Sequence, residues 1–515
     1  RDPRAFPTII DGLGSSTHAV YCHDEYCTDD TRLDGFVITG GYASNNGHVV
    51  DGRGGGLFID STESPVFANI QFVGNRAIDY GGAVYVRDGS PEFYDCVFSD
   101  NRIDTGGLLG GAVATYTNYV DSLHFERTIF AGNTAYQNGG AIGTYAPLTC
   151  VSCVFAGNRA SGPDADDGGG AIWAYGADLS LVNVTAYGNR GYRGGALLAR
   201  QGDTHIYNSV FADNQAVGGV DDELWFDGGT QTIEYTDIKN VTWAGTGNIA
   251  SDPGFYLASG TDHTRSQVDA EYDSTAQITT LLLTDYMMKR QVPGDLRGAF
   301  VQPDQTENLL FPILDNGART IQVRGDITDR IDPVNPLQIR DLHLGHHSPC
   351  VDAGSSGVTP SPGDVDLENN PRFDSPDDGF GPATVDMGAY EQRDCVYYVD
   401  VSGNDSDPGT SWGTPVETIQ VGVDLAANAA SDPSLAPKGY CEVWLYGDTY
   451  YLSSLDGEIE LADDVHVYGG FGASERSRRQ REWAIGLNET HVTACHDPAC
   501  GTRETTVFEC RAIDG

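Results

Sequence analysis

Acidic side chains at alternating positions form one candidate for metal chemistry in this sequence. Asp364, Asp366 and Glu368 lie two residues apart in the stretch DVDLENNPRFD. Carboxylate oxygens are the ligands that Ca²⁺ prefers, so calcium is the one cofactor that we consider. The stretch lacks the full spacing of an EF-hand loop, and a solvated turn is the favoured interpretation. These three residues are therefore only weak calcium candidates.

A second acidic group is followed by basic residues in the next repeat of the chain. Asp164, Asp166 and Asp167 precede Arg190 and Arg193. A polysaccharide lyase needs carboxylates that hold calcium and a cation that acts as base. A glycoside hydrolase needs two carboxylates that face one another across the sugar. These acidic and basic residues could take such roles.

The cysteines indicate where the protein works. Eleven Cys without a zinc-like arrangement of CxxC motifs predict disulfides and an oxidising, extracellular compartment. The stretches CHDEYC and CHDPAC predict small clasps. Cys150 and Cys153 are expected on one strand with their side chains on opposite faces, so we do not pair them. The candidate disulfide cysteines are Cys22, Cys27, Cys495, Cys500 and Cys510.

The charge of the chain excludes several classes of partner. The sequence has 74 acidic and 30 basic residues, which gives a formal net charge of -44. Such a chain would repel nucleic acid and an acidic membrane surface. No apolar run reaches the roughly 18 residues of a membrane-spanning helix, so no span is expected.

Two short phrases alternate through the chain from about Pro65 to Gln215. One is Phe-x-x-Asn, in which Ala186 once replaces the Phe, and the other is Gly-Gly-Ala followed by an aliphatic residue. Repeats of roughly 20 to 50 residues indicate a solenoid. Each strand then stacks on its counterpart in the next coil, at about 4.8 Å. The ladder residues are Phe72, Phe98, Phe130, Phe155, Phe211, Asn75, Asn101, Asn133, Asn158, Asn189 and Asn214.

We interpret these ladders as structural rather than catalytic. Phe side chains would fill the core, and Asn can hydrogen-bond the turn of the next coil and adopt the left-handed conformation that a corner needs. Longer insertions, such as Thr105 to Leu109 and Ser161 to Asp167, are expected to project loops from one side of the solenoid. We expect ligand contacts on that side.

The spacing of strand-like runs divides the chain into four segments. Residues 1–254 are predicted to form the coils, 255–345 a small inserted β subdomain, and 346–394 a turn-rich closing segment. Residues 395–515 resemble the strand and helix that cap the N-terminal end of a β-helix. In this cap, Thr414, Pro415 and Glu417 form a capping box. The expected apolar face consists of Val416, Ile419, Val423 and Ala427.

Several phrases resemble bacterial surface proteins. The Phe-x-x-Asn and Gly-Gly-Ala phrases resemble the repeats of polymorphic outer membrane proteins. The remaining phrases resemble surface proteins of the choice-of-anchor Q type, and they lie at residues 398–420, 467–483, 33–41 and 348–391. The chain is circularly shifted relative to the module of that family. The resemblance implies an all-β fold, a right-handed parallel β-helix of the pectate-lyase superfold.

We predict an extracellular structural or adhesive protein of the cell surface. The shifted order suggests either one period of a longer polyprotein or a subunit whose residues 395–515 begin a β-helix that the next subunit completes. The second arrangement would build a head-to-tail filament through exposed strand edges. In that filament, cysteines near the two ends could meet across the joint. Copies of the chain are then the first partner, and surface glycans or other cells are further candidates.

The alternative is a carbohydrate-active β-helix enzyme, because the superfold also includes pectate lyases and polygalacturonases. The phrases NTD, DD, GHG and RIK are absent in polygalacturonase order, and GHH at Gly345 lies outside the repeats. An acidic surface would also repel an acidic polysaccharide. We therefore predict no catalytic and no cofactor-binding residues.

Overall fold

The chain folds into two compact units. The first comprises residues 1–344, 348–374 and 381–391, and the second comprises residues 345–347, 375–380 and 392–515. The computed structural model describes residues 8–15, 18–23, 26–44, 52–104, 106–116, 119–164, 167–219, 223–255, 264–265, 267–283, 296–317, 319–332, 337–345, 348–361, 363, 365–368, 372, 385–391, 396–407, 409, 415–430, 441–446, 449–451, 459, 461–462, 465–471 and 491–493.

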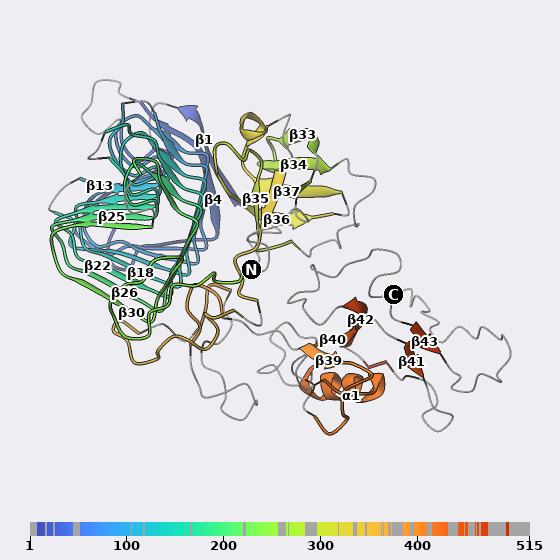
Figure 1. The fold of residues 1–515 in the computed structure, drawn as a ribbon. Coiled ribbons are helices and arrows are strands. Elements are labelled where there is room, and N and C mark those ends of the chain that lie inside the picture. Colours follow the sequence, from blue (N-terminus) through green and yellow to red (C-terminus); the bar gives the residue numbers. More distant parts are fainter. Residues whose placement is uncertain are drawn as a thin grey trace. The chain divides into compact units, whose positions relative to one another are not determined.

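Stacked coils form most of the first unit (Figure 1), and their strands build three parallel sheets. Sheet A has 15 strands. Its longer strands are β1 (Thr8–Ser15), β4 (Phe36–Ala43), β7 (Gln71–Val73), β11 (Val97–Ser99), β15 (Ile129–Ala131), β19 (Val154–Ala156), β23 (Thr185–Tyr187), β27 (Val210–Ala212) and β31 (Asp237–Ile238). Its short strands are β8 (Arg76–Ala77), β12 (Arg102–Ile103), β16 (Thr134–Ala135), β20 (Arg159–Ala160), β24 (Arg190–Gly191) and β28 (Gln215–Ala216).

Sheets B and C each have 8 strands and complete the coils. Sheet B consists of β2 (Val20–His23), β5 (Leu57–Asp60), β9 (Val84–Asp88), β13 (Val113–Thr115), β17 (Ile142–Thr144), β21 (Ile172–Tyr175), β25 (Leu197–Arg200) and β29 (Leu224–Asp227). Sheet C consists of β3 (Arg32–Asp34), β6 (Val66–Ala68), β10 (Glu92–Tyr94), β14 (Leu123–Glu126), β18 (Leu148–Val151), β22 (Leu179–Val182), β26 (Thr204–Tyr207) and β30 (Gln231–Glu234). The parallel β-helix predicted from the repeats is confirmed.

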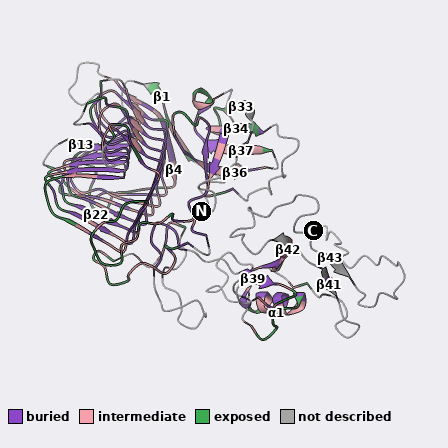
Figure 2. Ribbon diagram, viewed as in Figure 1, coloured by how far each residue is buried: buried purple, intermediate pink, exposed green. Residues whose placement is uncertain are grey.

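The Phe column fills the core of the coils, which Figure 2 shows as buried ribbon. Phe72, Phe98, Phe130 and Phe155 stack with ring centroids 4.7 to 4.8 Å apart and ring planes within 9° of parallel. Phe155 is then followed in register by Ala186 and Phe211. Because identical residues occupy identical positions in each coil, one rotamer packs well throughout the column.

A second column inside the coils consists of the six repeat asparagines, which are at most 3% exposed. The Asn101 side chain shows the pattern: its Nδ2 donates to the Phe72 carbonyl oxygen at 2.9 Å and to Asn133 Oδ1 at 3.0 Å. Asn133 Oδ1 also accepts the backbone N–H of Asn101 at 3.0 Å. The column ends where Asn214 donates to Glu223 Oε2. Every coil is therefore tied to the next one by buried amide hydrogen bonds.

The corners of the coils differ from the expectation. The left-handed φ falls on the residue before each ladder Asn, namely Gly74, Asp100, Gly132, Gly157, Gly188 and Asp213, with φ between 52° and 65°. The asparagines themselves have no positive φ. Gly and Asp tolerate this conformation. Because Gly or Asp takes the left-handed conformation, the Asn backbone and side chain can form hydrogen bonds along the column.

The inserted segment forms an antiparallel sheet of 7 strands beside sheet A (Figure 1). Its strands are β32 (Thr264–Arg265), β33 (Gln267–Asp273), β34 (Ile278–Leu283), β35 (Phe300–Gln302), β36 (Phe311–Asn316), β37 (Thr320–Arg324) and β38 (Leu337–Arg340), with a short 3₁₀ helix η2 (Thr328–Arg330). Arg324 donates to Gln71, Arg330 pairs with Asp100, and Asn308 donates to the Gly188 carbonyl. The subdomain thus covers part of the outer face of sheet A.

The described part of the second unit contains a parallel sheet in the order β39–β40–β42 and the helix α1. Its elements are β39 (Val396–Val399), α1 (Ile419–Ala430), β40 (Cys441–Tyr446), β41 (Thr449–Tyr451), β42 (Val465–Phe471) and β43 (His491–Thr493). Ile419, Val423 and Ala426 of the helix pack against Val399 and Val443 of the sheet. An amphipathic helix on a parallel sheet agrees with the predicted arrangement of this segment.

The start of α1 differs from the predicted capping box. The helix begins at Ile419, and Thr414 lies outside the described residues. Asp405, from a preceding turn, accepts the backbone N–H groups of Glu417 and Thr418 and the Thr418 hydroxyl. The predicted apolar face included Ala427, but Ala426 and Ala429 are the buried alanines of the last turns. A capping residue from outside the helix carries no local signature in sequence.

Removing one rung of the Asn column tests what holds the coils together. In Asn133→Ala, two donors of Asn101 lose their acceptor, so we expect the free energy of unfolding to fall by about 2 to 5 kcal/mol. Chemical denaturation followed by circular dichroism measures the change. Asn428→Ala is the control, because Asn428 is exposed on α1. Equal effects of the two substitutions would contradict the structural role of the column.

Candidate functional site

The ladder residues offer no free chemistry. Each rung from Asn75 to Asn189 donates its amide N–H groups to a carbonyl of the preceding coil and to the next rung, and Asn214 donates to a carbonyl and to Glu223. The amide oxygens of the rungs after Asn75 accept backbone and side-chain N–H groups from the preceding rung, and that of Asn75 accepts the backbone N–H of Gly41. A side chain whose hydrogen-bonding groups are all in use inside a core has nothing left for a substrate. The ladder asparagines are therefore structural.

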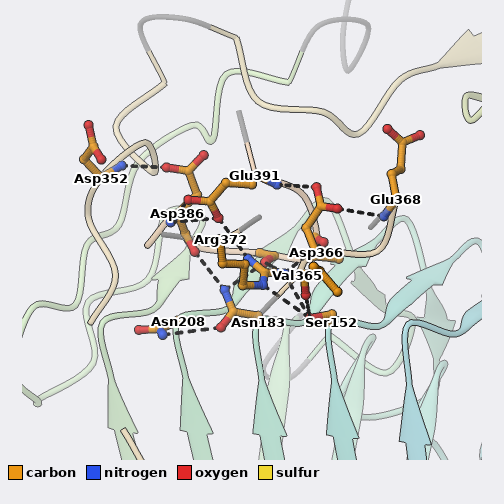
Figure 3. Close-up of polar contacts among 12 residues, drawn as sticks. Ser152, Asn183, Asn208, Asp352, Val365, Asp366, Glu368, Arg372, Asp386 and Glu391 are labelled. Atoms are coloured by element: carbon orange, nitrogen blue, oxygen red, sulfur yellow. Dashed lines mark hydrogen bonds and ion pairs between the residues drawn. The ribbon is translucent and has the colours of Figure 1, made fainter. Parts of the chain in front are cut away.

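The closing segment is fastened to the coils by a buried arginine (Figure 3). Arg372 is 0% exposed, and its Nη1 lies 3.1 Å from Glu391 Oε2. The same guanidinium donates to Ser152 Oγ, at the corner after β18, and to the carbonyl oxygens of Gly388 and Ala389. Full use of its donors makes a buried arginine tolerable. This cluster is a structural fastening of the motif around residues 348–391.

Two of the calcium candidates are part of that fastening. Asp366 is 0% exposed, and its two oxygens accept the backbone N–H groups of Glu368 at 2.8 Å and Glu391 at 2.9 Å (Figure 3). Glu368 Oε2 lies 3.3 Å from His343 Nε2. Asp364 lies outside the described residues. Among the described residues, no group of three or more His, Cys, Asp and Glu is arranged to hold a metal ion.

His343 is held between two carboxylates. Its Nδ1 lies 2.5 Å from Asp341 Oδ1, and its ring centroid lies 4.1 Å from that of Tyr390. Burial lowers the pKa of His343, but the charges of Asp341 and Glu368 outweigh it and raise that pKa to about 10. The imidazolium therefore ties the segment after β38 to the closing segment. Sequence reasoning missed this cluster, because Glu368 and Tyr390 are far along the chain from Asp341 and His343.

The cysteines follow the predictions in part. Cys22 and Cys27 form a disulfide, whereas Cys495, Cys500 and Cys510 lie outside the described residues. Cys150 and Cys153 are free, but the predicted reason was wrong. Both are buried in the same core, because Ser152 between them has φ 53° and turns the chain from β18 into β19. Burial raises the pKa of the Cys150 thiol.

The outer face of sheet B carries a largely buried aromatic cluster. Phe58, Tyr85 and Trp173 belong to a cluster separate from the core inside the coils. Tyr145, Tyr175 and Trp225 pack against it and are partly buried. Leu109, at the end of the first predicted insertion, lies in the same cluster. Leu109 is the last residue of the first predicted insertion, and Gly168 follows the second. The two residues align through Asn138 by parallel bridges. The loops predicted to mark the ligand-binding side thus border this surface.

The acidic group considered for catalysis has a local role. Asp164 donates its backbone N–H to Asp167 Oδ2 at 3.1 Å, and Asp166 lies outside the described residues. The Arg193 guanidinium lies 4.9 Å from the centroid of the Trp225 ring. Asp164 and Asp167 therefore close a turn of their own loop, and Arg193 contributes to the aromatic face of sheet B.

A polar pocket of about 580 Å³ opens where the last coils meet the inserted subdomain. Its lining includes Asp213, Glu223, Lys239 and Arg340. Lys239 Nζ lies 2.9 Å from Asp213 Oδ1. Burial lowers the pKa of Lys239, but Asp213 and the neighbouring Asp252 outweigh it and raise that pKa. Sequence reasoning missed the pocket, because Arg340 of the inserted subdomain completes a lining whose other named residues lie on different coils.

Comparison with known proteins gives one local similarity. Residues 127–145 match the Chlamydia polymorphic membrane protein repeat. The matched stretch contains Phe130, Asn133 and the Gly-Gly-Ala phrase at Gly139, and it spans β15, β16 and β17 (Ile142–Thr144). No curated protein and no solved structure matches the chain. No helix among the described residues is long and apolar enough to cross a membrane. The repeat suggests a surface-associated, adhesin-like protein.

The His343 cluster predicts a pH dependence of stability. A folded pKa of about 10, above the usual value near 6.5, means that the contribution is complete below about pH 6.5 and is lost as pH rises through about 10. His343→Asn should lower the free energy of unfolding near pH 7 by about 2 kcal/mol and have little effect above about pH 10. Urea denaturation at several pH values measures this. Parallel pH profiles of wild type and variant would contradict the account, and His205→Asn is the control.

Proposed function

We propose that the protein is an extracellular structural and adhesive β-solenoid of the cell surface, related to the choice-of-anchor Q type. The column of asparagines carries the proposal, because it ties the coils into a continuous body and occupies the hydrogen-bonding groups of its own side chains. The match to a polymorphic membrane protein repeat supports placement at a surface. The disulfide between Cys22 and Cys27 supports an oxidising compartment.

Head-to-tail assembly of copies is the form that we propose for this protein. Within the described residues, β2 and β3 each pair on one side only, and so does β42 of the second unit. The second unit already stacks β39, β40 and β42 in parallel, as successive coils do. Open edges of parallel strands attract further strands. A second unit that continues the first coil of the next copy would give a filament rather than a closed ring.

Electron microscopy and light scattering of the purified chain test this assembly. The full chain should form filaments whose length grows with concentration, and a chain that ends at Glu391 should not. Adding the shortened chain should also cap and shorten filaments of the full one. Uniform monomers of the full chain at all concentrations would overturn head-to-tail assembly.

The alternative function is a carbohydrate-active enzyme, and the polar pocket is the observation in its favour. Asp213 and Glu223 are carboxylates in one pocket with Lys239 and Arg340, which are residue types that such catalysis uses. The ion pair of Lys239 with Asp213 and the bond of Glu223 to Asn214 instead favour a structural role. Turnover of any polysaccharide in a panel, with or without calcium, that Asp213→Asn and Glu223→Gln abolish would replace our proposal by this one.

A further inference from the structure

Aromatic side chains run along the outer face of sheet B in strand register. Tyr21, Phe58 and Tyr85 are aligned on β2, β5 and β9. After Ala114 and Gly143, the same row continues through Trp173, Leu198 and Trp225. The row therefore follows the axis of the solenoid, one residue per coil.

Ring contacts make this row continuous across the gap at Ala114 and Gly143. The Tyr80 ring lies 5.9 Å from Tyr85 and 4.9 Å from Tyr116. Tyr116 lies 5.3 Å from Tyr145, and Tyr145 lies 5.3 Å from Trp173. We call Tyr21, Phe58, Tyr80, Tyr85, Tyr116, Tyr145, Trp173, Tyr175 and Trp225 the aromatic face. Such contacts hold the rings in fixed orientations before any ligand arrives.

Part of this face is open to solvent. Tyr21 is 53% exposed and Tyr116 is 47% exposed, whereas Phe58, Tyr80, Tyr85 and Trp173 are at most 7% exposed. Tyr145, Tyr175 and Trp225 are partly buried. The inserted subdomain lies beside sheet A, whereas β13 and β25 lie on another side of the coils (Figure 1). A contiguous aromatic surface on the outside of a protein marks an interaction site.

Polar donors lie among the rings. Trp173 is 5% exposed, and its indole N–H has no hydrogen-bond partner among the described residues. Nε of Arg53 is buried and likewise has no partner in the part of the chain that the structure describes, while its guanidinium lies 5.0 Å from the centroid of Tyr80. A buried donor without a partner costs about 1 to 3 kcal/mol, which an acceptor on a ligand would offset. Arg193 and Arg200 lie over Trp225 at the other end of the face.

The chemistry of the face selects one class of partner. Flat rings stack on the C–H faces of sugars, and Tyr hydroxyls with Arg and Trp donors can bond sugar hydroxyls. An acidic polymer would be repelled by a chain whose formal net charge is -44. The same negative charge would repel an anionic lipid surface. An extended neutral polysaccharide fits best, because its sugars repeat along a line as the coils do.

We propose that the aromatic face binds an extended neutral polysaccharide that lies along the solenoid axis. This inference rests on the proposed adhesive function and names the partner of that function. Sugars stack on the exposed and partly exposed rings of Tyr21, Tyr116, Tyr145, Tyr175 and Trp225, and the buried rings beneath hold these in place. Trp173 and Arg53 donate to the sugar oxygens. The loops that border sheet B select among polysaccharides.

Affinity electrophoresis of the full chain in gels that contain soluble neutral polysaccharides, such as hydroxyethyl cellulose, xylan or glucomannan, tests the proposal. Tyr116→Ala and Trp225→Ala should each weaken binding about tenfold, which corresponds to about 1.4 kcal/mol. Tyr116→Phe, which keeps the ring, should bind within about threefold of wild type. Tyr207→Ala, a partly exposed tyrosine of sheet C, is the matched control. Thermal melting of every variant checks that the coils remain folded.

The outcomes separate this inference from the proposed function. Retardation by none of the neutral polysaccharides, or equal retardation of wild type, Tyr116→Ala and Trp225→Ala, would overturn the inference. Binding to anionic polymers alone, if abolished by salt, would overturn it as well. Filaments that form without any polysaccharide binding would leave the structural function in place and remove only this partner. Polysaccharide binding by a chain that never assembles would remove head-to-tail assembly and leave this partner in place.

Discussion

The need to satisfy buried amides is the constraint on which this structure depends. Asn101 and its counterparts each carry two donors and an acceptor into a core from which water is excluded. Those groups find partners only if another coil lies directly above and below. The stacked Phe rings add packing, but their contacts tolerate small shifts, whereas the amide column fixes the register. Coil after coil must therefore repeat with the same geometry, and the solenoid grows as one body.

The ladder side chains inside the coils are occupied by packing and hydrogen bonds. Which outer faces of the sheets stay exposed therefore decides where other molecules can bind. Sheet A is covered by the inserted subdomain and by the closing segment, which Arg372 and His343 fasten in place. Carboxylates that looked suited to calcium are part of this fastening. Sheet B has an aromatic cluster on its outer face, bordered by the variable loops, in which Phe58 and Tyr85 are buried while Tyr21 and Tyr116 are exposed. The contacts on the outer face of sheet A hold the first unit together. The exposed part of the outer face of sheet B is available for contact with other molecules.

The repeated phrases predicted the coils because stacking in register repeats residue types along the chain. The left-handed corner was predicted for the asparagines from the preference of that residue type alone. In the structure, Gly74 and Asp100 adopt this conformation. Asp405 as the cap of α1, the salt bridge of Arg372 and the pocket around Lys239 depend on contacts between distant segments. The aromatic face did have a signal. Phe58, Tyr85 and Trp173 each stand two residues after the third residue of a GGG or GGA phrase, but Ala114 and Gly143 interrupt the series.

Native-state hydrogen exchange tests the central claim most directly, namely that the amide column makes the coils a rigid, inert scaffold with function confined to the outside. The account predicts that the backbone amides of Asn101, Asn133 and Asn158 exchange slowest, through opening of many coils at once. Amides in the loops beside sheet B should exchange much faster. Exchange of the ladder amides as fast as these loops, or independent opening of single coils, would contradict it.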